Sequence, residues 1–133
     1  MPFDEPRPEV PVTPALALAP APAPAVPLTS RMRELFGPNG ERWAKGAFIR
    51  PSMARGGELT YCLVGARMVA EGWEIAERYG DTRAIQRAGC AVMRGLNALG
   101  IHTAPTEYND HCKTSWPDIV RVLDAMEQIE AVA

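Results

Sequence analysis

The fold is decided by residues 58–99, which read ELTYCLVGARMVAEGWEIAERYGDTRAIQRAGCAVMRGLNAL. From Glu58 to Tyr79, apolar residues recur at helical spacing, at Leu59, Cys62, Leu63, Ala66, Val69, Ala70, Trp73 and Ala76. The same spacing follows at Ile85, Ala88, Gly89, Val92, Leu96 and Leu99. Between the two parts, Gly80 fits a helix C-terminus and Asp81 fits an N-cap. We therefore expect two helices joined as a hairpin.

Shorter patterns on both sides of this hairpin predict two more helices. Residues 29–36 form a short apolar-periodic stretch that ends at Gly37, and residues 41–57 are irregular, a loop or helical turn held by its aromatic residues. Ser115 fits the N-cap of a last helix, with Asp118 three residues later. No stretch is a convincing strand. The sequence predicts an all-α fold, a small helical bundle with a central helical hairpin.

The N-terminal residues differ in kind from the rest of the chain. Nine of the thirteen prolines lie in residues 1–28. Because proline fixes φ and lacks an amide donor, this segment cannot build a core and should be extended. We expect residues 1–28 to be a disordered Pro/Ala-rich arm and residues 29–133 to be a single helical domain.

Composition indicates a cytoplasmic protein without a membrane segment. No apolar run approaches the length of a membrane span. The arm begins with Asp4 and Glu5 and is interrupted by prolines, which is unlike a secretory signal. Cys62, Cys90 and Cys112 are odd in number, and two of them fall inside predicted helices, which suits free thiols in a reducing compartment.

Charge is unevenly distributed along the predicted domain. Residues 31–94 hold eleven basic and seven acidic residues, whereas residues 95–133 hold two basic and six acidic ones. Such an arrangement can steer a charged partner, although solvated helix faces explain it more simply. Basic residues gather between Arg31 and Arg55, but the chain has a net charge of −2 and no nucleic-acid-binding motif. We therefore do not expect nucleic acid as a partner.

Cys62 is the first candidate for chemistry. It lies in the first turns of a predicted helix, where free amides and the helix dipole favour a thiolate. His102 and Asn109 follow in the order found in papain-type thiol enzymes, and Asp110 is a further candidate. Cys62 also falls on the apolar stripe, where free cysteine packs as a small hydrophobic residue. The catalytic candidates are thus Cys62, His102 and Asp110, and a buried Cys62 is the favoured alternative.

A second candidate is the polar turn Tyr108-Asn109-Asp110. It is either a recognition loop or ordinary turn chemistry, in which Asn and Asp side chains bind nearby amides. Trp43 similarly either anchors an irregular segment or contacts a partner. The candidate binding residues are therefore Trp43, Tyr108, Asn109 and Asp110. Cysteine and histidine show no metal-ligand spacing, so we expect neither a metal nor a cofactor.

Three short motifs point to one family. They are Trp-x-x-Gly-Ala at Trp43, Cys-x-x-Gly-Ala at Cys62 and Asn-Asp at Asn109. Together they resemble an uncharacterised family of small bacterial and phage proteins, a domain of unknown function, over most of residues 31–133. Tyr108 stands where that pattern has tryptophan. The resemblance implies no activity, but it implies that these motifs act as one unit.

The sequence also leads to an expectation about the class of function. We expect a small accessory or regulatory protein that binds another protein, of phage or mobile-element origin, rather than an enzyme. The alternative is a small cysteine-dependent hydrolase or transferase that uses Cys62. In either case, Asn109 and Asp110 should lie against the Trp43 segment and the helix start at Cys62, because the last helix must pack on the hairpin. The oligomeric state is left open.

Overall fold

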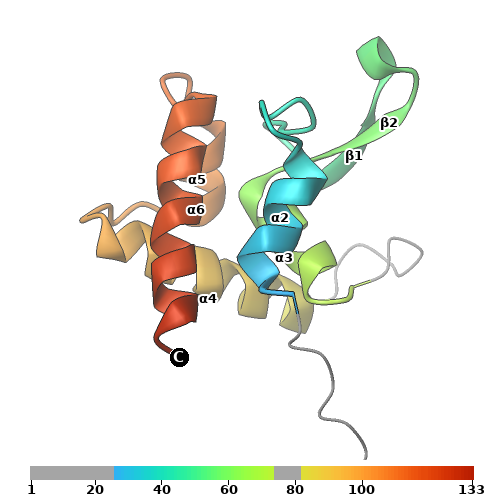
Figure 1. The fold of residues 1–133 in the computed structure, drawn as a ribbon. Helices are drawn as coiled ribbons and strands as arrows, with labels where there is room; N and C mark the ends of the chain where they lie inside the picture. The colour runs from blue at the N-terminus through green and yellow to red at the C-terminus, as the bar shows by residue number, and fades with distance from the viewer. Residues whose placement is uncertain (1–25, 74–81) are drawn as a thin grey trace, which may run out of the picture.

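The computed structural model describes residues 26–73 and 82–133 (Figure 1). In chain order its elements are α2 (Leu28–Phe36), β1 (Ile49–Ser52), a 3-10 turn η1 (Met53–Arg55), β2 (Glu58–Tyr61), α3 (Leu63–Ala70), α4 (Thr82–Ala98), α5 (Pro105–Asp110) and α6 (Trp116–Ala131). The helices α2, α3, α4 and α6 pack around one core, and the two strands project from it as a hairpin. Most of the predicted arm lies outside the described residues.

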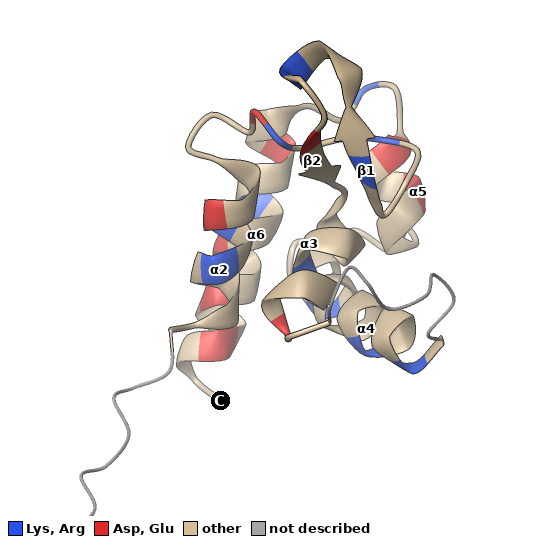
Figure 2. Cartoon of the chain, turned by 90° about the vertical axis from the view of Figure 1, so that its right-hand side faces the viewer, with Lys and Arg blue, Asp and Glu red and all other residues tan. Residues whose placement is uncertain are grey.

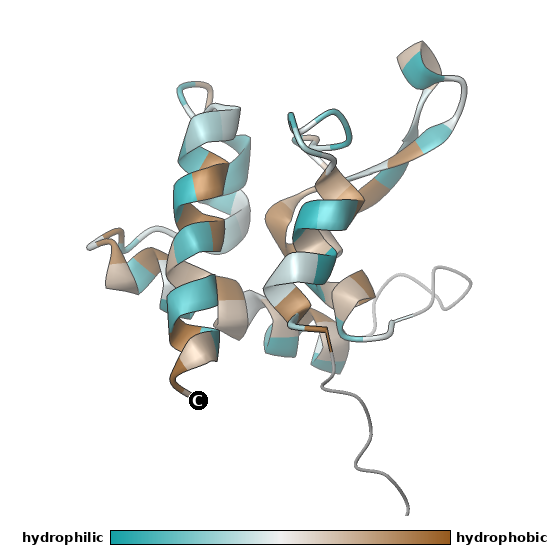
Figure 3. Cartoon of the chain, viewed as in Figure 1, coloured by the Kyte–Doolittle hydropathy of each residue, from teal (hydrophilic) through white to brown (hydrophobic). Residues whose placement is uncertain are grey.

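The core is filled by large apolar side chains from all four of these helices. The largest fully buried ones are Phe36, Met32, Leu63, Leu96, Ile119 and Leu123. Apolar and polar segments alternate along α6 in Figure 3, as expected for a helix with one buried face. Gly95 lets α4 approach α6 closely, since a Cβ there would lie 2.6 Å from the Cγ of Met126.

Side chains satisfy the free amides at the starts of two helices. Asp118 accepts the backbone N–H of Ser115 at 2.9 Å, so the predicted cap of α6 is present. This bond lowers the pKa of the Asp118 carboxyl. Glu130, near the end of α6, accepts the amides of Leu28 and Thr29 at 2.9 and 3.2 Å. The last helix thereby caps the first described one.

The prediction of an all-α fold is wrong, because β1 and β2 form an antiparallel pair. Their register runs from Ile49 opposite Tyr61 to Ser52 opposite Glu58. Gly56 and Gly57 have φ values of 67° and 88°, a left-handed conformation that lets the chain reverse there. Residues 58–61 therefore pair with the strand just before them in the chain, and their apolar spacing belongs to a strand rather than to a helix.

The predicted helix from Glu58 to Tyr79 is also corrected. The helix α3 begins at Leu63, with Cys62 as its N-cap, and ends at Ala70, just before Gly72 with a φ of 103°. Helices α3 and α4 do pack against each other. The predicted junction at Gly80-Asp81 lies outside the described residues.

Candidate functional site

Asn109, on α5, is the centre of a buried polar network. Its side chain is fully buried, and its Oδ1 accepts hydrogen bonds from the Trp43 indole N–H at 2.8 Å and the Leu63 amide at 3.1 Å. Its Nδ2 donates to the Ala44 carbonyl at 3.0 Å and to Oδ1 of Asp110 at 2.9 Å. A primary amide has two donors and two acceptor lone pairs, so every position is used. We call these four bonds the Asn109 network.

Two further bonds hold the loop of residues 43–48 along α5. Oδ1 of Asp110 also accepts the Gly46 amide at 2.9 Å. Lys45 donates through Nζ to the His111 carbonyl at 2.7 Å. The expectation that Asn109 and Asp110 lie against the Trp43 segment and the start of the Cys62 helix is therefore confirmed.

Trp43 is enclosed on several sides. Its ring lies 6.2 Å from the Trp116 ring, which in turn meets Phe36 edge-on at 5.5 Å. Nζ of Lys45 lies 5.4 Å from the Trp43 ring centre, a cation–π distance. The Trp43 indole thus anchors the 43–48 loop to the core, and its remaining exposed surface is available for contact.

Cys62 is buried at the start of α3. Only 2% of its surface is exposed, and its sulfur accepts the Gly65 amide at 3.4 Å. Burial raises the pKa of the Cys62 thiol to about 11; amide hydrogen bonds oppose the rise, and the charge of Asp110 adds to it. Cys62 is therefore a protonated thiol at neutral pH.

Gly65 explains the spacing of the Cys-x-x-Gly pair. A Cβ at this position would collide with the carbonyl oxygen of Phe48. That same carbonyl accepts the backbone N–H of Cys62 at 3.0 Å. The absence of a side chain at Gly65 lets the 43–48 loop lie directly on the first turn of α3, and Cys62 caps that turn.

These contacts shape a pocket of about 330 Å³ between the loop and α5. Its lining residues are Gly46, Ala47, Phe48, Cys62, Thr106 and Asp110, and we call it the loop pocket. The lining is mostly apolar. Within the described part of the chain, Oδ2 of Asp110 has no hydrogen-bond partner, whereas its Oδ1 has two. The pocket therefore has mostly apolar walls, and its lining includes a carboxylate, Asp110, with one oxygen that no described residue binds.

The structure brings together only part of the predicted catalytic set. Cys62 and Asp110 both line the loop pocket, but His102 is exposed and does not line it. His111 is also outside it, and its Nδ1 accepts the Lys113 amide at 3.0 Å. Tyr108 is half-buried, and burial raises the pKa of its hydroxyl. No imidazole among the described residues lines the pocket with Cys62.

A comparison with models of protein families bears out the resemblance to a family of unknown function. A family of unknown function, DUF6197, matches the chain over residues 29–128. The chain belongs to this family. No curated protein and no solved structure matches it. Because the function of this family is unknown, membership in DUF6197 implies no activity for the chain.

A second hollow lies on the strand hairpin of this DUF6197 chain. It has a volume of about 540 Å³ and is lined by residues from three segments, Glu41, Trp43, Ala44, Lys45, Arg50, Pro51, Ser52, Met53, Arg55 and Thr60. We call it the hairpin groove. Sequence reasoning missed it because residues 49–61 were not predicted as strands. The sequence features that could have indicated the groove are the basic residues up to Arg55 and the Gly56-Gly57 pair that follows them.

The described residues of this DUF6197 chain show neither a cluster of metal ligands nor a membrane-spanning helix. Within residues 26–73 and 82–133, no three His, Cys, Asp or Glu side chains come together as metal ligands would. In the same residues, none of the helices has the length and apolar character that crossing a bilayer requires.

Proposed function

We propose that this DUF6197 protein is a small accessory or regulatory protein that acts by binding another protein, and that the loop pocket receives a side chain of that partner. The supporting observation is that Asp110, whose Oδ2 no described residue binds, lines a mostly apolar pocket. Asn109 holds both walls, since it bonds to the 43–48 loop and to the start of α3. A pocket that is already ordered loses little entropy on binding.

The lining of the loop pocket favours a lysine or arginine side chain. Ala47, Phe48 and Cys62 can cover an aliphatic stem, and Asp110 can accept from the charged end. A carboxylate that gains a charged donor forms one of the stronger hydrogen bonds. The partner residue should therefore be basic, at the tip of a loop or helix that reaches between the 43–48 loop and α5.

A cysteine-dependent hydrolase or transferase is the less favoured function. Such an enzyme needs a thiolate and a base that accepts its proton. Burial keeps Cys62 protonated, and Asp110, the acidic neighbour in the pocket, raises the pKa of the thiol rather than lowering it. The contacts of Cys62 are those of a helix cap, which supports a structural role.

We also propose a cytoplasmic location and a phage or mobile-element origin. Cys90 and Cys112 are exposed free thiols, which persist in a reducing compartment. The origin rests on the motif resemblance described above and on the arginine-rich composition, with twelve arginines and two lysines.

Site-specific photocrosslinking tests the binding function. A photoreactive amino acid replaces Ala47, which lines the loop pocket, in the full-length protein inside cells of the source species. A matched control replaces Gln128 on the exposed face of α6. We expect a discrete protein adduct at position 47 that is absent at position 128 and is lost when Asp110→Asn removes the carboxylate charge. No adduct at position 47, or the same adducts at both positions, would contradict the proposal.

A further inference from the structure

The hairpin groove carries more cationic than anionic side chains. Lys45, Arg50 and Arg55 line it, and Glu41 is the acidic residue among its lining. Figure 2 shows basic segments on β1 and at the tip of the hairpin, away from the acidic segments of α6. The groove therefore favours a negatively charged occupant.

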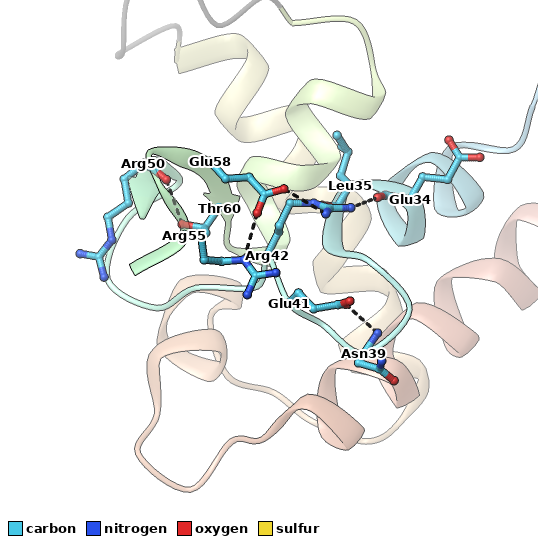
Figure 4. A network of polar contacts seen from close by, with 9 residues as sticks. All are labelled: Glu34, Leu35, Asn39, Glu41, Arg42, Arg50, Arg55, Glu58 and Thr60. Carbon is cyan, nitrogen blue, oxygen red and sulfur yellow. Dashed lines mark hydrogen bonds and ion pairs between the residues drawn. The ribbon is translucent and has the colours of Figure 1, made fainter. Parts of the chain in front are cut away.

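The carboxylates near this groove are already engaged. Glu58 accepts from Arg55 at 2.9 Å and from Arg42 at 3.3 Å (Figure 4). Glu41 accepts the Asn39 amide at 2.9 Å, and hydrogen bonds from its own backbone amide and from that of Asn39 lower the pKa of its carboxyl. Neither carboxylate neutralises Arg50.

Of the three cations that line the groove, Arg50 has the fewest side-chain contacts with described residues. Its carbonyl accepts the Thr60 hydroxyl, but its guanidinium makes no hydrogen bond or ion pair with any described residue. In Figure 4 the guanidinium points away from the network around Glu58. A guanidinium in this state can bind a carboxylate with two parallel hydrogen bonds.

An apolar contact is available beside these charges. Met53, in the turn between the strands, is 90% exposed and lines the groove. Methionine is enriched at protein interfaces because its flexible thioether adapts to a partner surface. Arg50 and Met53 therefore offer one charged and one apolar contact on the same short hairpin.

We propose that the hairpin groove binds an acidic segment of the same partner protein, with Arg50 as its main charged contact. This assignment of the groove rests on the proposed binding function. The partner would then carry charges of both signs: a basic residue that enters the loop pocket and carboxylates that enter the groove. An acidic peptide fits better than a nucleic acid. A nucleic acid repeats its charge along its whole length, whereas the cations here are confined to one groove of a chain with a net charge of −2.

An NMR titration tests this assignment. The isotope-labelled full chain is mixed with a short acetylated peptide of alternating Glu and Leu, with a matching Lys and Leu peptide, or with single-stranded oligothymidylate. We expect the Glu peptide alone to shift the amides of Lys45, Arg50 and Met53, with binding that weakens as salt rises. Arg50→Glu should raise its Kd by about tenfold or more, which is about 1.4 kcal/mol.

The matched control is Arg94→Glu, the same charge change on the exposed face of α4. It should leave the Kd of the Glu peptide within about twofold, since surface charges far from a site are screened. Equal weakening by both variants, shifts spread over α4, no shift at the groove, or tighter binding of oligothymidylate would overturn the assignment. The crosslink at position 47 distinguishes the two proposals. An adduct that survives Arg50→Glu unchanged would contradict the role of the groove but not the binding function. The absence of any adduct would contradict the binding function itself.

Discussion

The 43–48 loop and the strand hairpin are neighbours along the chain, yet they are held in different ways. The loop is held from inside by the fully buried Asn109 and its four hydrogen bonds. The hairpin is held by a short strand pair and by ion pairs of Glu58 that are open to solvent. Losing a buried hydrogen-bond partner costs about 1–3 kcal/mol for each group left unpaired, whereas an exposed ion pair contributes about 0–1 kcal/mol. Loss of the ordered loop therefore costs much of the free energy of unfolding. The charged side chains of the hairpin contribute little to stability and can bind a partner instead.

The largest expected effect comes from removing the centre of the network. Asn109→Ala leaves the Trp43 indole, the Leu63 amide and the Ala44 carbonyl without partners. The free energy of unfolding, measured by urea denaturation, should fall by about 3 kcal/mol or more. Asn97→Ala, on the exposed side of α4, is the control and should change it by less than about 0.5 kcal/mol. Similar losses in the two variants would mean that the loop is not held by Asn109.

The buried Cys62, which lies beneath the loop, should make stability depend on pH. Burial raises the pKa of the Cys62 thiol from 9.0 to about 11. The contribution of the protonated thiol to the free energy of unfolding is therefore complete below about pH 9 and is lost as the pH rises through 11. The thiol binds its proton more tightly in the folded chain, so the free energy of unfolding falls across this window, by about 3 kcal/mol. Cys62→Ala should remove this part of the pH dependence. An unchanged profile in that variant would show that Cys62 is not buried as described.

Two glycine substitutions separate close packing from helix propensity. Gly65→Ala drives a Cβ into the Phe48 carbonyl and should destabilise the chain by about 1–3 kcal/mol. Gly89→Ala meets nothing within 4 Å and should stabilise α4 by up to about 1 kcal/mol. Thermal unfolding midpoints should therefore move in opposite directions. A stabilising Gly65→Ala would mean that the loop does not lie on α3.

The smallest effect is expected on the hairpin. Glu58→Gln removes the carboxylate that Arg42 and Arg55 share. Because these groups are exposed, the free energy of unfolding should fall by less than about 1 kcal/mol, and less still at high salt. A loss as large as that of Asn109→Ala would erase the distinction between the two regions.

The same contrast explains which parts of the structure the sequence predicted. The cap at Ser115 and Asp118 and the apolar stripes of α4 and α6 depend on neighbours a few residues away, so pattern alone identifies them. The meeting of Asn109 with Trp43 followed from where its segment lies before the last helix, although this segment forms the short helix α5 and not the predicted turn. The strand pairing of Ile49 with Tyr61 did not follow, because residues 41–57 were expected to be irregular and because Leu59, Cys62 and Leu63 share a spacing with a helix. The hairpin groove was missed with it.

The most direct test of the central claim, that Asn109 holds the loop from inside, is hydrogen exchange at the Trp43 indole N–H followed by NMR. This proton is bonded to Asn109 at 2.8 Å in a half-buried site, whereas the backbone of Met53 and Ala54 lies in the exposed turn of the hairpin. We expect the Trp43 proton to exchange far more slowly than the amides of Met53 and Ala54, and Asn109→Ala to remove this protection. A Trp43 proton that exchanges as fast as those amides in the native chain would contradict it.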